Sequence, residues 1–132
     1  MHTPTLSTPL RLLGTIEAGW PSPAEEELSD TLRIDEWLIE NREATFMLKP
    51  SNNAMIGAGI LAGDLVLLDR SRTPKDGDIV LAEVDDTRAM RYYRKRGSRV
   101  YLEAAHPKYQ PIFPQHQLKV EAVVVAVIRK YY

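Results

Sequence analysis

The stretch GDLVLLDRSRTPKDGDIVLA, residues 63–82, decides the fold class of this chain. It holds two short apolar runs, residues 65–68 and 79–82, and a Gly-Asp pair precedes each of them. Glycine allows unusual backbone angles and aspartate accepts hydrogen bonds from turn amides, so each pair indicates a turn that leads into a strand. Short apolar runs separated by such turns are typical of a β-sheet.

The same pattern continues on both sides of this stretch. Turn signals at Asp85-Asp86 and Gly97-Ser98 separate further candidate strands, which lie at residues 45–48, 88–94, 100–103 and 120–128. No helical periodicity interrupts them, so the sequence predicts a mostly-β fold, either a curled sheet or a small open barrel. The last run is apolar over most of its length, which predicts a strand that is buried on both faces.

The first 44 residues differ in character from the rest. They are rich in proline, glutamate and threonine, and Pro21 and Pro23 indicate a loop. Residues 35–41 are compatible with one or two helical turns. We therefore expect an extended N-terminal arm with one short helix over residues 1–44, followed by a β domain over residues 45–132.

Composition narrows the classes of function. The chain has 132 residues, a net charge of -1 and no cysteine, which excludes disulfides, thiol nucleophiles and cysteine-ligated metals. The three histidines lack the spacing of a metal site, and there is no phosphate-binding or dinucleotide motif. The longest apolar run, residues 122–128, is too short to span a bilayer, and no secretory signal is apparent. We expect a soluble cytoplasmic protein with no metal, no cofactor and no membrane contact.

A basic cluster at residues 88–99 has two interpretations. Six lysines and arginines surround Tyr92 and Tyr93, a mixture that is also found in nucleic-acid grooves. The alternative is a solvated β-hairpin whose charges offset the acidic run Glu25-Glu26-Glu27. The net charge near zero favours the hairpin.

Residues 46–68 carry a resemblance to a known family. Ser51, Met55, Gly59-Ile60 and the Gly-Asp-Leu at 63–65 match, in order and spacing, the active-site segment of the LexA/UmuD family of self-cleaving SOS-response proteins. The arm agrees, because residues 18–24 (AGWPSPA) are similar to the cleavage region of the UmuD branch. The resemblance extends from about residue 9 to 129 and implies the curled peptidase sheet of that family.

The resemblance also implies a catalytic dyad, and both of its positions are substituted. The family uses a serine nucleophile activated by a buried lysine base. The serine position falls on Ala54 and the lysine position on Arg91. A methyl group cannot attack a carbonyl, and arginine stays protonated in proteins. Asn52 and Asn53 replace the residues that precede the serine in the family pattern.

Three explanations of these substitutions remain open. The serine was replaced deliberately to trap an uncleaved form, or the chain is a natural pseudopeptidase, or another nucleophile acts. Changes spread across the whole motif favour the pseudopeptidase. Ser51 with Lys95 is a poor substitute dyad, because Lys95 is displaced by about 13 Å along the strand from Arg91. The matching scissile bond is Ala18–Gly19, which an active relative could still cut in trans.

Partners and function also follow from the resemblance. It implies a homodimer, or a heterodimer with an active relative, that binds the RecA filament and a Y-family DNA polymerase. We expect a non-cleaving, UmuD-like accessory factor for translesion DNA synthesis or SOS regulation. One alternative is an active serine/lysine autopeptidase, present as an inactive variant or using another nucleophile. The other is a nucleic-acid-binding regulator that uses the 88–99 hairpin.

Overall fold

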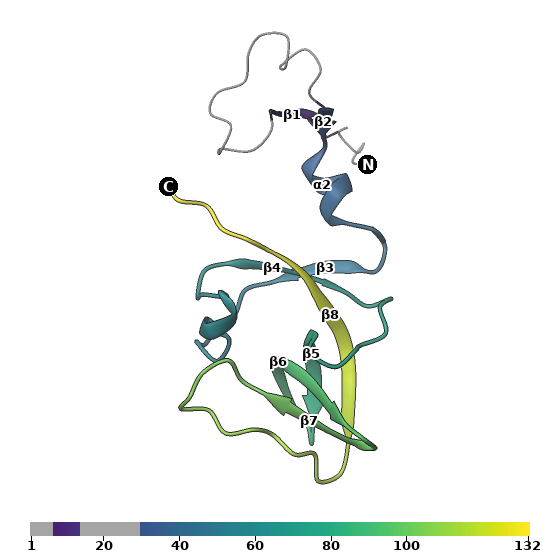
Figure 1. Ribbon diagram of the computed structural model, residues 1–132, viewed down its shortest axis with the longest axis vertical. Helices are drawn as coiled ribbons and strands as arrows, with labels where there is room; N and C mark the ends of the chain where they lie inside the picture. Colours follow the sequence, from purple (N-terminus) through teal and green to yellow (C-terminus); the bar gives the residue numbers. More distant parts are fainter. Residues whose placement is uncertain (1–6, 14–29) are drawn as a thin grey trace. The chain divides into compact units, whose positions relative to one another are not determined.

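The computed structural model describes residues 7–13 and 30–132 (Figure 1). Contacts divide the chain into two compact units, Met1–Glu40 and Asn41–Tyr132. The predicted cleavage bond Ala18–Gly19 lies outside the described residues, as does the acidic run at 25–27.

The first unit contains a short helix and a two-stranded sheet. Strand β1 (Leu10–Leu12) pairs antiparallel with β2 (Asp30–Leu32), and helix α2 (Ile34–Leu38) follows directly. The short helix was expected from the sequence, and it ends where Ile39 adopts extended backbone angles. The sheet was not expected, because three-residue strands leave too little pattern to recognise.

The second unit is a six-stranded antiparallel sheet with the order β3-β4-β8-β5-β6-β7. Its strands are β3 (Thr45–Leu48), β4 (Leu65–Asp69), β5 (Ile79–Val84), β6 (Thr87–Arg96), β7 (Arg99–Glu103) and β8 (Leu118–Ile128). The sheet curls without closing, and β3 and β7 are its two edges. This confirms the mostly-β prediction and the curled sheet.

Strand β8 crosses the middle of this sheet between β4 and β5 (Figure 1). The prediction that it is buried on both faces is wrong for most of its length. Only Ala122 and Val123 are buried, whereas Val127 and Ile128 are 39% and 37% exposed. An antiparallel sheet needs cover on one face only, so a central strand can keep apolar side chains at its surface.

The core consists of two apolar clusters, and strand β5 contributes to both of them. One cluster contains Leu68, Val66, Ile60 and Met55, and a second forms around Val80, Ala82 and Leu102. Fully burying a side chain of the size of leucine or valine contributes roughly 1.5–3 kcal/mol. The first cluster, through Met55 and Ile60, fixes the segment between β3 and β4 against the sheet.

Gly57 joins that segment to the loop before β8. It lies in a short 3-10 turn, η2 (Ile56–Ala58), and its N–H donates to the carbonyl of Ala105 at 2.8 Å. A Cβ at Gly57 would lie 2.6 Å from that oxygen, closer than van der Waals contact permits. Only glycine therefore fits here. The contact holds the 104–110 loop beside the residues that follow β3.

Candidate functional site

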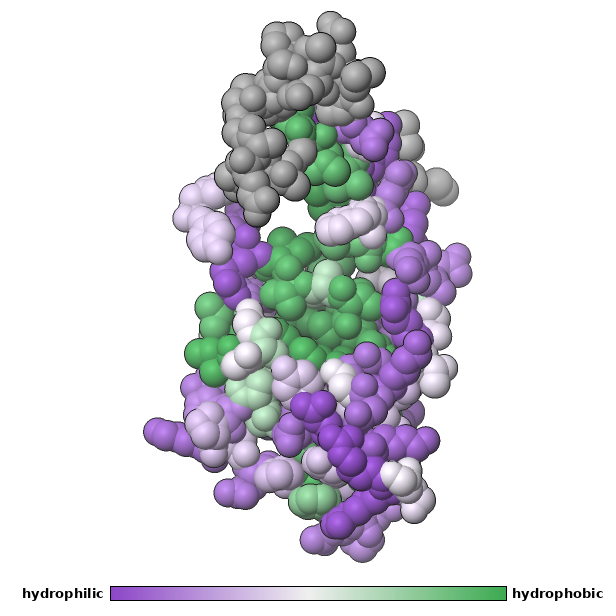
Figure 2. Space-filling view, viewed as in Figure 1, coloured by the Kyte–Doolittle hydropathy of each residue, from purple (hydrophilic) through white to green (hydrophobic). Residues whose placement is uncertain are grey.

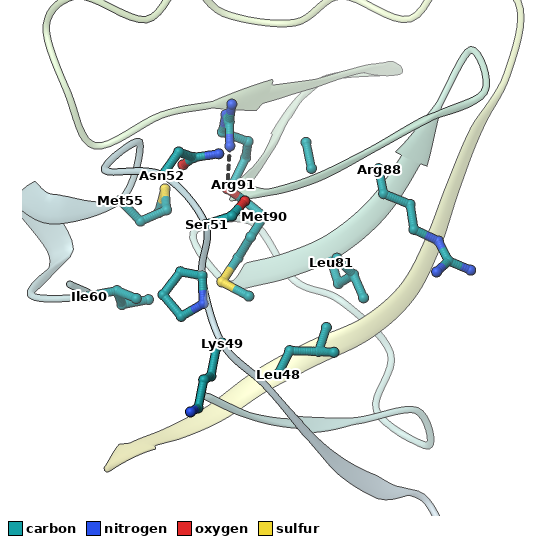
Figure 3. Close-up of a pocket in the computed structure, with 12 residues that line it drawn as sticks. Leu48, Lys49, Ser51, Asn52, Met55, Ile60, Leu81, Arg88, Met90 and Arg91 are labelled. Atoms are coloured by element: carbon teal, nitrogen blue, oxygen red, sulfur yellow. Dashed lines mark hydrogen bonds between the residues drawn. The ribbon is translucent and has the colours of Figure 1, made fainter. Parts of the chain in front are cut away.

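A cleft of about 140 Å³ lies between the segment that follows β3 and strands β5 and β6 (Figure 3). Its surface combines an apolar floor with a few polar groups and three basic side chains. The lining residues are Leu48, Lys49, Pro50, Ser51, Asn52, Met55, Ile60, Leu81, Arg88, Ala89, Met90 and Arg91. Figure 3 draws Asn52 and Arg91 at the upper end of the cleft and Leu48 and Lys49 at the lower end.

Arg91 is the most deeply buried charge of the cleft. It projects from β6, where its backbone pairs with Val80 of β5, and it is 9% exposed. One terminal nitrogen, Nη1, donates to the carbonyl of Met90 at 2.8 Å, but the buried Nε has no acceptor. The ring of Tyr109 lies 5.3 Å from the guanidinium carbon. Burial lowers the pKa of Arg91, since desolvation disfavours the charged form.

The guanidinium of Arg91 has no ion-pair partner among residues 7–13 and 30–132. Arginine remains charged even where burial disfavours the charge. A buried charge that lacks a carboxylate is costly. The cleft therefore contains a positive charge that its own residues compensate only in part.

Ala54 is fully buried and does not line the cleft. Its N–H donates to the side-chain oxygen of Asn52 at 3.0 Å, which fixes the local turn. The hydroxyl of Tyr109 donates to the side-chain oxygen of Asn53 at 3.1 Å. Because Tyr109 also contacts Arg91, one aromatic ring connects the segment of Ala54 to strand β6.

Four of the residues singled out from the sequence, namely Ser51, Asn52, Met55 and Arg91, line this one cleft. Lys95, the proposed substitute base, does not line it, and its backbone N–H donates to the carboxylate of Asp76 at 2.8 Å. This supports the view that Ser51 and Lys95 do not form a dyad.

Sequence reasoning missed two residues of the site. Lys49 lines the cleft, and Tyr109 lies over Arg91. Lys49 lies within residues 46–68, two positions before Ser51, and could have been noticed for that reason. Tyr109 belongs to a loop, and no periodic signal connects it to β6.

The cleft offers space and polar groups for a ligand, but its described residues include no recognisable nucleophile–base pair. Among the lining residues that the structure describes, Ser51 alone carries a hydroxyl, and none is a histidine or a carboxylic acid. Lys49 is exposed, whereas a lysine that serves as a base needs burial among apolar groups.

Within residues 7–13 and 30–132, no three His, Asp or Glu side chains are placed to hold a metal ion. No helix in the described part of the chain is long and apolar enough to cross a membrane.

Much of the basic cluster on β6 and β7 is ion-paired. Arg88 pairs with Glu121 at 2.9 Å, Arg94 with Glu103 at 3.0 Å and Arg96 with Asp76 at 2.8 Å. Charges that are already paired attract a phosphate backbone less strongly. The pairs weaken the nucleic-acid interpretation, whereas the acidic run at 25–27, which was expected to offset these charges, lies outside the described residues.

Comparison with known proteins gives a consistent result. The sequence profile of the family described as Peptidase S24-like matches residues 11–125. The LexA repressors of Anaeromyxobacter dehalogenans and of Anaeromyxobacter sp. (strain K) are both 32% identical to this chain over 123 residues. The aligned region covers 90% of this chain and 54% of each repressor. The chain therefore spans about half the length of the curated relatives it matches.

Proposed function

We propose that this chain, which belongs to the S24-like peptidase family, acts as a binding module that does not cleave itself. The observation that carries the proposal is the substitution of both dyad positions, by Ala54 and Arg91. Alanine offers no nucleophile, and arginine cannot become the neutral base that a serine hydroxyl requires. The family resemblance supplies these two positions, and the cleft beside them supports a retained binding role.

The surroundings of the two substitutions support a stable, inactive site. Ala54 is fully buried beside a turn that Asn52 holds by a hydrogen bond. Arg91 is anchored by the Met90 carbonyl and by Tyr109. The cleft thus keeps its shape while lacking the groups for acyl transfer.

The biological setting that we propose is the SOS response. Its support is the similarity to LexA repressors together with the UmuD-like arm. In this setting the chain acts as a dimeric accessory factor for translesion DNA synthesis or SOS regulation. Its proposed partners are a second copy, the RecA filament and a Y-family DNA polymerase. In a heterodimer, an active relative could cut the Ala18–Gly19 bond in trans.

The first test is intact mass spectrometry after incubation at alkaline pH and, separately, with RecA filaments. We expect the native chain to stay whole under both conditions. The Ala54→Ser/Arg91→Lys double variant should be cut after Ala18, because a lysine buried at position 91 can lose its proton. The Ala54→Ser single variant is the matched control and should stay whole, since Arg91 cannot act as the base.

Cleavage of the native chain at the Ala18–Gly19 bond would contradict the proposal. A Ser51→Ala variant then separates the remaining explanations. If that change stops the cleavage, Ser51 is the nucleophile and the chain is an active autopeptidase. If the native chain and the double variant both stay whole, the alignment of the dyad with Ala54 and Arg91 is wrong.

A further inference from the structure

We infer that the cleft recognises a carboxylate on an extended peptide, such as a glutamate side chain flanked by apolar residues, and that Arg91 is the contact group. The inference rests on the proposed function only in treating the cleft as a binding site. It adds the chemical class of the ligand.

The charged residues that are described as lining the cleft are all basic. Three of its lining residues, Lys49, Arg88 and Arg91, are basic, and none of the lining residues within 7–13 and 30–132 is acidic. Arg88 is neutralised by Glu121 at 2.9 Å, and Lys49 is exposed to solvent. Arg91 remains as the charge that is both buried and without a described acidic partner. An anion in the cleft would therefore gain most from Arg91.

The state of Arg91 indicates an incomplete set of contacts. Only 9% of the residue is exposed, and its Nε lies buried with no hydrogen-bond acceptor. Buried polar groups in folded proteins nearly always have a partner, so each exception needs an explanation. A ligand carboxylate in the cleft would give the guanidinium as a whole a charge partner, because arginine and carboxylate form the stronger, charge-assisted class of hydrogen bond. Such a ligand would offset the desolvation of the guanidinium.

The size and lining of the space indicate a peptide side chain. A cleft of about 140 Å³ holds only the volume of a few water molecules, which suits one side chain and not a nucleotide. Met55, Ile60, Leu81 and Met90 supply apolar surface beside Arg91. Figure 3 shows Met55 and Ile60 on one side of the cleft and Leu81 on the other. An acidic residue with apolar neighbours matches this mixture.

The test compares two capped peptides, acetyl-Ala-Leu-Glu-Leu-Ala-amide and its glutamine counterpart, by isothermal titration calorimetry with the full chain. We expect the glutamate peptide to bind about tenfold tighter or better, the effect of one charge-assisted hydrogen bond. Arg91→Met should abolish the preference. Arg96→Met is the matched control, because Arg96 lies on the same strand but is paired with Asp76 and does not line the cleft, and it should keep the preference.

A second readout protects the test against misfolding of the Arg91→Met variant. In the native chain, the nuclear magnetic resonance signal of the Arg91 Nε–H should shift with the glutamate peptide and not with the glutamine peptide. Equal binding of the two peptides, or binding of neither, would overturn the inference. Inorganic phosphate that binds as tightly as the glutamate peptide would also overturn it, by showing a general anion site. None of these outcomes alters the cleavage experiment, so the two proposals can fail independently.

Discussion

At the scale of single residues, Asp64 and Arg129 form the most complete charge pair of the second unit. Asp64 is 2% exposed, and its two carboxylate oxygens accept from Nε and Nη2 of Arg129, each at 2.7 Å. The N–H of Leu61 donates to the same carboxylate, and Arg129 also donates to the carbonyl of Gly59. These bonds attach the residue after β8 to the turn that leads into β4. Arg129 and Arg91 differ in this respect. The Nε and Nη2 of Arg129 both donate to a carboxylate, whereas the Nε of Arg91 has no described acceptor.

This pair predicts a dependence of stability on pH. The hydrogen bonds from Arg129 and Leu61 lower the pKa of Asp64 from 3.8 to about 2. A carboxyl group whose folded pKa is depressed stabilises the fold above its unfolded pKa, and the stabilisation is lost as pH falls toward the folded value. The loss should fall between about pH 4 and pH 2. Asp64→Asn should lower the thermal midpoint at pH 7 by several degrees and flatten the stability profile in that window.

Thermal unfolding followed by circular dichroism across this pH range would measure both effects. Asp86→Asn is a suitable control, because it removes an exposed carboxylate and should leave the profile nearly unchanged. An Asp64→Asn profile that keeps the slope of the native chain below pH 4 would show that other carboxyl groups carry the dependence.

At the scale of elements, the turn between β5 and β6 gives its two aspartates different roles. Val84 pairs with Thr87, so Asp85 and Asp86 form a two-residue loop, and both have positive φ, 46° and 74°. Two positive φ angles are characteristic of the type I′ turn, whose usual second residue is glycine. The carboxylate of Asp85 also accepts three backbone N–H groups from residues 115–117, which fixes the segment before β8.

A matched pair of glycine variants separates these roles. Asp86→Gly should raise the free energy of unfolding by roughly 0.5 kcal/mol, because it relieves the positive φ and breaks no described hydrogen bond. Asp85→Gly relieves the same kind of angle but removes the acceptor for three N–H groups, so it should lower the unfolding midpoint. Urea denaturation would measure both changes. Equal effects of the two variants would mean that the 115–117 contacts add nothing to stability.

Some of these elements could be predicted from the sequence, and others could not. The two Gly-Asp pairs and the Asp85-Asp86 turn act locally, so their signals could be read from the sequence, and the strands that they border are present. The position of β8 between β4 and β5 depends on long-range pairing that no local pattern encodes. For the same reason, the contact of Gly57 with Ala105 and the placement of Tyr109 over Arg91 could not be predicted from the sequence. The loop that provides both partners carries no periodic signal.

At the scale of the second unit as a whole, apolar side chains remain exposed on one part of the sheet. Met47 on β3 is 60% exposed and Ile128 on β8 is 37% exposed, and both lie on the same face of the sheet because they pair with Leu67 and Leu65 of β4. Figure 2 shows apolar side chains gathered over the region where β3, β4 and the end of β8 lie. Strand β3 is also an edge of the sheet, and an edge with apolar neighbours favours association. This surface is the one that we propose for the homodimer.

A charge placed on that surface tests whether it forms the homodimer. Ile128→Glu and Met47→Glu would each bury a carboxylate without a partner on association, so each should weaken the dimer at least tenfold. Light scattering coupled to size-exclusion chromatography, run over a series of protein concentrations, measures the change. Lys119→Glu, an exposed position at the other end of β8, reverses a charge away from the surface and should leave the dimer intact. A native chain that stays monomeric at every concentration, or an Ile128→Glu chain that still dimerises, would place any partner elsewhere. The cleft residues Arg91 and Asn52 are absent from this surface, so loss of the dimer should leave binding of the glutamate peptide unchanged.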